Sequence, residues 1–221
     1  MDLNPRTVNG GLLGIICGGL LLASVAMVSA PGADSPASEV STYYADHVFS
    51  VLLATAVSLA AGVIFLAFAL RLAVAVTPGP DDLEKWRLVW SSGVLVFAGV
   101  IVAALPVVAL ALTSDANAAN SWTRTLAQLA DGTDAALFVT IALFLAAVAT
   151  QGTKGPAWLR AGAAIGALLA IARAMIGLFG VESVLDAVAP LAFIALILAA
   201  SVWMLLPGPP QPDSDRDQRP R

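Results

Sequence analysis

Charged residues are scarce in this chain. They make up 12% of the 221 residues, about half the share of roughly 25% that soluble domains carry. The net charge is −4, so no basic surface exists of the kind that binds nucleic acid. The composition therefore excludes an ordinary soluble domain and predicts no nucleic-acid partner.

Side chains that hold metals and cofactors are equally rare. His47 is the only histidine, which excludes bis-histidine haem ligation within one subunit and histidine-based zinc sites. Cys17 is the only cysteine, so no internal disulfide forms. The two lysines, Lys85 and Lys154, fall in predicted loops, which excludes an intramembrane Schiff base. We expect no cofactor and no metal.

Catalytic patterns are missing as well. The chain has no phosphate-binding Walker A segment and no glycine-rich dinucleotide turn. Ser91 and Ser92 belong to one predicted membrane side and His47 to the other, so a serine–histidine pair does not assemble. The sequence predicts no catalytic residue, and we expect the protein not to be an enzyme.

Long apolar runs are what the chain does have. In a bilayer, runs of about 18 residues or more are read as helical spans, because a helix satisfies every backbone polar group internally. The runs predict an all-α, polytopic six-helix bundle in residues 1–206 and a disordered cytoplasmic tail, rich in proline and charge, in residues 207–221. The six expected spans are about 10–30, 48–76, 88–113, 134–150, 156–180 and 183–206.

Orientation follows from the distribution of lysine and arginine, which concentrate on the cytoplasmic side of membrane proteins. With the N-terminus inside, only Arg124 lies outside and Arg173 lies within a span. The other nine cations fall on the inside: Arg6, Arg71, Lys85, Arg87, Lys154, Arg160, Arg216, Arg219 and Arg221. We predict both termini in the cytoplasm and the cell membrane as the location. The alternative for the first span is a cleaved signal ending in the "VSA" of residues 28–30.

Several details of the spans are predicted too. The second run has 29 residues, about 43 Å at 1.5 Å each, against about 30 Å of hydrocarbon. It either tilts or projects outward, with a start as early as Pro36. In the outer loop, Trp122, Leu126 and Leu129 form one stripe, which predicts a short helix in the outer interface; an ordinary ordered loop is the alternative.

Loop chemistry suggests where two helices begin. Asp81 or Asp82 suits the N-cap of the third span. Pro156 suits the first turn of the fifth.

Small residues four apart predict close helix packing. Gly10, Gly14 and Gly18 share one face of the first span, and Gly162 and Gly166 one face of the fifth. Small residues at this spacing let helix backbones approach closely in lipid. We expect a tightly packed bundle, with self-association as a further option. Cys17 falls on the same face of the first span, which predicts an inert, buried thiol.

Arg173 is a permanent cation inside an apolar run. At 100° per residue it shares the face of Gly162, Gly166 and Gly177, which should meet other helices. The short connection between spans four and five places Arg173 level with Asp134.

The turn between spans five and six places Arg173 level with Pro190, which frees the carbonyl of Asp186. We expect Asp134 as the partner of Arg173, with Asp186 as the alternative and Asp131 or Glu182 as further neighbours. Three interpretations stay open: an ion pair that pins helices, an arginine that snorkels to the surface, and a site for a ligand or ion.

Taken whole, the chain resembles uncharacterised multi-pass membrane proteins common in high-GC bacteria and some archaea. The glycine-rich first span, "STYYADHVFSVLLATAVSLAAGVIFLAFALRLAVAV" and "KGPAWLRAGAAIGALLAIA" carry the resemblance, which covers most of the chain. It implies a six-helix fold and no catalytic residues.

Two functions follow. The favoured one is a structural or accessory subunit that contacts the lipid bilayer and docks other membrane proteins or a second copy of itself. The alternative is a small transporter or sensor with an outward-facing site around Arg173.

Overall fold

The computed structural model describes residues 5–28, 30–32, 34–77, 83–114, 121–178 and 183–206. Within these ranges it contains seven helices and no strand, which confirms the all-α prediction. The helices are α1 (Pro5–Met27), α2 (Ala37–Asp46), α3 (Val48–Val76), α4 (Leu83–Thr113), α5 (Ser121–Gln151), α6 (Ala157–Leu178) and α7 (Leu185–Leu205).

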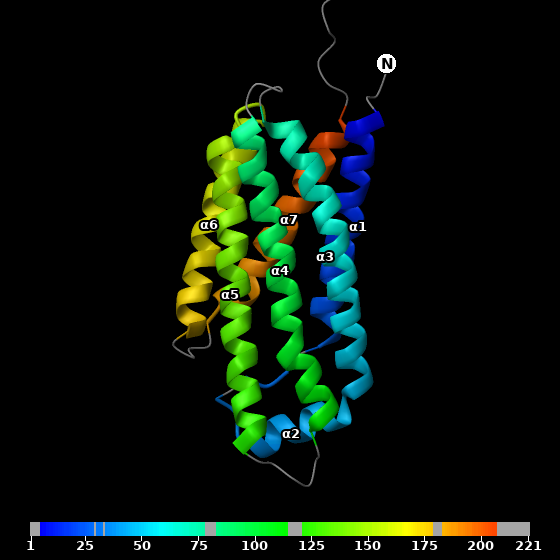
Figure 1. Cartoon of the computed structure of the whole chain (residues 1–221), viewed down its shortest axis with the longest axis vertical. Helices are drawn as coiled ribbons and strands as arrows, with labels where there is room; N and C mark the ends of the chain where they lie inside the picture. Colours follow the sequence, from blue (N-terminus) through cyan, green and yellow to red (C-terminus); the bar gives the residue numbers. More distant parts are fainter. Residues whose placement is uncertain are drawn as a thin grey trace, which may run out of the picture.

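Six of the helices, all except α2, are long and apolar enough to cross a membrane. They run side by side along the long axis of the molecule, and α2 lies across one end (Figure 1). Each long helix packs against the next along the chain, and α7 packs against α1, so the six form a closed ring. We call the end that α2 covers the α2 end and the opposite end, where α1 begins and α7 finishes, the terminus end.

The second run, residues 48–76, is the single helix α3, and the segment before it forms the separate helix α2 instead of an outward extension of α3. The break falls at His47, whose φ and ψ of −116° and 21° are not helical. The backbone N–H of His47 still donates to the carbonyl of Tyr43, and one of its ring nitrogens lies 2.9 Å from the same oxygen. The segment before His47 therefore turns across the bundle as α2 instead of extending α3 outward.

The prediction of a short interfacial helix before the fourth span is wrong. Residues 121–133 are the first part of α5, which continues without interruption to Gln151. Leu126 is 7% exposed and packs against α2, whereas Trp122 is 59% exposed. The stripe of Trp122, Leu126 and Leu129 does not lie on one buried surface. Leu126 contacts α2, whereas Trp122 and Leu129 are exposed, because α2 covers only one side of this helix.

Other expected boundaries also move. The third span begins at Leu83, at least five residues earlier than expected, and the first ends at Met27 instead of residue 30. Pro156 directly precedes α6, and its carbonyl accepts the N–H groups of Leu159 and Arg160. The candidate caps at residues 81 and 82, Glu182, and the tail at 207–221 lie outside the described residues.

The glycine face of α1 is covered by α3 and α7. A methyl group on Gly14 would overlap Oγ of Ser201 and come within 2.7 Å of the Phe68 ring. One on Gly18 would come within 2.6 Å of Leu198, and one on Gly10 within 2.9 Å of Arg71 Cβ. These contacts lie within one chain, so the close approach that the spacing predicted serves the bundle itself.

The glycines of α6 also face neighbouring helices. A methyl group on Gly162 would lie 3.0 Å from Leu196 of α7, and one on Gly166 would lie 2.9 Å from Leu145 of α5. Cys17 is likewise fully buried, with its Sγ 3.5 Å from the carbonyl oxygen of Ala61. The small-residue faces are therefore interior surfaces of the ring.

Candidate functional site

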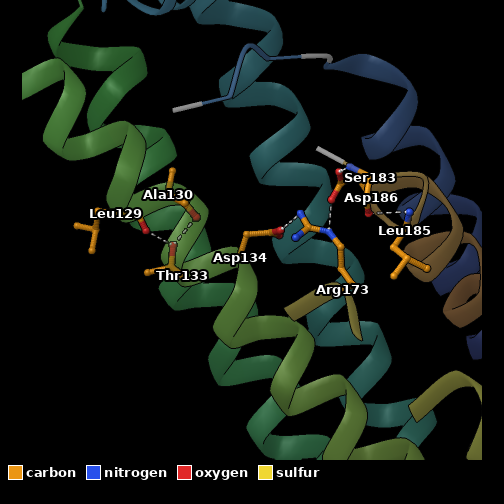
Figure 2. A network of polar contacts seen from close by, with 8 residues as sticks. All are labelled: Leu129, Ala130, Thr133, Asp134, Arg173, Ser183, Leu185 and Asp186. Carbon is orange, nitrogen blue, oxygen red and sulfur yellow. Dashed lines mark hydrogen bonds and ion pairs between the residues drawn. The ribbon is translucent and has the colours of Figure 1, made fainter. Parts of the chain in front are cut away.

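A cluster of three charged side chains joins α5, α6 and α7 (Figure 2). Nη2 of Arg173 donates a 2.9 Å hydrogen bond to Oδ2 of Asp134. Nε of Arg173 lies 2.6 Å from Oδ1 of Asp186, close enough for an ion pair, although its N–H does not point at that oxygen. The Arg173 side chain is 15% exposed, against 40% for Asp134 and 38% for Asp186. The arginine is thus the most buried member and carries a carboxylate on each side.

Two residues shape the space that the guanidinium occupies. Gly177 lies one turn beyond Arg173 on α6, where an added methyl group would collide with Nη1. Phe138 of α5 places its ring centroid 5.2 Å from Cζ of Arg173, within the range of a cation–π contact. A side chain at position 177 would therefore require the guanidinium to shift.

Asp186 is oriented by the start of α7. The backbone N–H of Ser183 donates to Oδ2 of Asp186 at 2.8 Å, and the N–H of Leu185 donates to the Ser183 hydroxyl at 3.1 Å. Reciprocal bonds of this kind cap a helix N-terminus, where a carboxylate is also favoured by the helix dipole. One oxygen of Asp186 therefore caps α7 while the other faces Arg173.

The two carboxylates that the sequence offered as alternatives occupy the site together. Asp131, a further candidate, has an exposed side chain one helical turn from Asp134 towards the α2 end. Arg173 thus links three helices, the geometry expected of a pinning ion pair.

Beside the cluster, a cavity of about 350 Å³ lies in the α2 half of the bundle. Its walls come from α1, α3, α4, α5 and α7. Most of the lining residues are alanine, valine and phenylalanine. The sequence interpretation missed it. The available signal was a gathering of small residues in the halves of the spans nearest α2, such as Ala54, Gly62, Ala103 and Ala104.

Few polar groups line the cavity, and most already have partners. The hydroxyls of Ser24 and Ser58 lie 2.7 Å apart, joining α1 to α3. Thr55 donates to the carbonyl of Val51 in its own helix. Asp134 is the charged residue in the wall. Its carboxylate has about four acceptor positions, and the hydrogen bond from Arg173 uses one of them.

The α2 helix packs behind the residues that form one end of the cavity. Val40 and Tyr44 of α2 pack in one apolar cluster with Leu110 of α4 and Leu126 of α5. Residues that pack in or against this cluster also line the cavity: Val28, Val51, Val107 and Ala130. Burial, aided by Tyr43 and Asp131, raises the pKa of the Tyr44 hydroxyl to about 12, so Tyr44 stays neutral in this apolar contact.

The described residues contain no group of three or more histidine, cysteine, aspartate or glutamate side chains placed to hold a metal ion. No known family model, curated protein or solved structure matches the chain. The cavity and the charged cluster are therefore the features that bear on function.

Proposed function

We propose that this is a multi-pass integral membrane protein that binds a small, largely apolar molecule in the cavity beside Arg173, as a sensor or carrier. The observation that carries the proposal is an apolar cavity in which Asp134 is the single charged residue among the described residues of the wall. Its volume of about 350 Å³ falls in the range of roughly 300–1,000 Å³ typical of ligand pockets, which combine apolar walls with few polar groups.

The energetics favour an occupant. Cavities left by core truncations cost about 24 cal/mol per Å³, which for a sealed and empty cavity of this volume would amount to about 8.4 kcal/mol. Whole domains are stable by only about 5–15 kcal/mol. A molecule or lipid chain that fills the space removes much of that cost, so stability and binding are coupled.

The helices around the cavity are continuous. Pro106 and Pro190 lie inside α4 and α7, and neither interrupts its helix. Transporters of the inverted-repeat kind bind their substrates at broken helices. Uninterrupted helices favour a sensor or another ligand-binding protein over such a transporter.

The accessory-subunit interpretation has lost its main support. It rested on glycine faces available to other membrane helices, and those faces contact helices of the same chain.

Filling the cavity tests the proposal. Ala103 lines the cavity, whereas its neighbour Val102 is exposed on the outer surface of α4. Native mass spectrometry of the protein released from its membrane should find a bound amphiphile in the wild type and in Val102→Phe, and none in Ala103→Phe. An identical set of bound molecules in Ala103→Phe and the wild type would contradict the proposal.

The cell membrane with both termini in the cytoplasm is part of the same proposal, supported by the excess of cations at the terminus end. Single cysteines at Ser35 and Thr153, in a Cys17→Ala background, test it with an impermeant maleimide on intact cells. Ser35 should react and Thr153 should not. Labelling of a cysteine at Thr153 from outside would indicate the opposite orientation and contradict the proposal.

A further inference from the structure

We propose that the cavity selects an amphiphile that carries a protonated amine, and that the ammonium group pairs with Asp134. The inference rests on the proposed function, because it assigns a chemical class to the molecule that the cavity holds.

The charged cluster indicates that the ligand carries a positive charge. One arginine faces two carboxylates, which leaves one net negative charge when all three are ionised. Of the described charged residues, Asp134 is the one that lines the cavity, and Arg173 lies over the ring of Phe138, another residue of the wall. A ligand in the cavity therefore meets a carboxylate first.

The Asp134 carboxylate is available to such a ligand. Its side chain is 40% exposed although the residue lies in the middle of α5 and borders the cavity. Arg173 donates one hydrogen bond to it, so acceptor positions remain for an ammonium group, which has three donors. A carboxylate ligand would be repelled, and an ammonium in an apolar wall needs a charged partner to offset its lost hydration.

The shape of the cavity suggests how the ligand lies. On α4 the wall runs from Val96 to Val107, about 16 Å at 1.5 Å per residue. Asp134 lies near the α2 end of the wall on α5, and Ile141 lies two turns deeper. Phe65 borders the deep part on α3. This arrangement fits a single alkyl chain directed to the centre of the bundle with its amine at the α2 end.

Two probes of equal chain length, decylamine and decan-1-ol, separate charge from apolar filling. Ligand-induced shifts in thermal midpoint are measured for the protein in zwitterionic nanodiscs, each variant against its own ligand-free midpoint, and converted to apparent affinities. Wild-type protein should bind decylamine about tenfold more tightly than decanol, the size of one charge-assisted hydrogen bond.

Asp134→Asn should bring the two probes to equal affinity. Asp186→Asn is the matched control: it removes the same unit of negative charge from the cluster but leaves the carboxylate that lines the cavity. A preference for the amine that comes from direct pairing with Asp134 should therefore survive, although it should be smaller than in the wild type. Arg173 keeps Asp186 as a partner in Asp134→Asn. The double variant Arg173→Gln with Asp134→Asn removes the same carboxylate without an unpaired cation and should show the same loss.

The outcomes separate the two proposals. Equal wild-type affinity for both probes, or an amine preference that Asp134→Asn retains, overturns selection for the amine and leaves the cavity as a binding site. Binding of neither probe by the wild type overturns both proposals. Loss of decanol binding in Ala103→Phe, together with loss of the amine preference only where Asp134 is changed, supports both.

Discussion

Apolar helices build both halves of the bundle, but the two halves are packed differently. At the terminus end, a void among Phe68, Leu72, Phe144 and their neighbours measures about 10 Å³, which is at the lower limit of the space that one water molecule needs. In the α2 half, the cavity is about 350 Å³. Hydrophobicity predicts that both halves lie in the membrane, but it does not decide which half is tightly packed.

Side-chain size explains the difference. Near the centre of the bundle, Phe65 packs edge to face against Phe144 at 5.2 Å and lies 5.7 Å from Phe193. Towards the α2 end, α3 and α4 line the cavity with the small residues Ala54, Gly62 and Ala103. The small residues on these helices leave space unfilled, and the charged cluster joins α5, α6 and α7 beside the cavity.

Enlarging one alanine in each half should give the largest difference in stability change between the two halves. Ala73 is fully buried at the terminus end, so Ala73→Leu should destabilise by about 3 kcal/mol, the upper end of typical overpacking costs. Ala103→Leu fills part of the cavity and should be neutral or stabilising. Thermal unfolding in detergent measures both variants. Equal losses would mean that the α2 half is as tightly packed as the other.

Breaking the ion cluster should have the next largest effect. Arg173→Leu leaves Asp134 and Asp186 facing each other without a cation. We expect a loss of about 2 kcal/mol, between the values for exposed and buried pairs, because both carboxylates are partly exposed.

Asp134→Leu should cost less, since Asp186 still pairs with Arg173. The double variant Arg173→Leu with Asp134→Leu should recover part of the loss. A double-mutant cycle in which the two losses simply add would show that the Arg173–Asp134 pair contributes no coupling energy.

The smallest effect concerns the glycine face of α1. Gly14→Ala should cost about 1 kcal/mol, because the overpacking at Ser201 and Phe68 exceeds the gain in helix propensity. Gly19→Ala, on the same helix, meets nothing within 4 Å and should be neutral or slightly stabilising. If chemical unfolding finds Gly19→Ala as costly as Gly14→Ala, close approach at Gly14 does not stabilise the bundle.

The depth of Arg173 was predictable from the sequence because short connections fix the level of antiparallel helices. Counting from the connection between α5 and α6 placed Arg173 beside Asp134, and the two lie 2.9 Å apart. Counting could not show that Asp186 pairs at the same time. That depends on the capping bonds of Ser183, which turn the carboxylate towards α6.

The amino-acid sequence by itself determined the all-α class, the six long apolar helices and the faces on which glycine and Arg173 lie. Hydrophobic run length and the 3.6-residue helical period are local properties. Only the tertiary structure decided the break at His47, the contact of α2 with α5, and the cavity. The break and the contact depend on packing between helices far apart in the chain, and the cavity depends on their summed side-chain volume, neither of which a local pattern records.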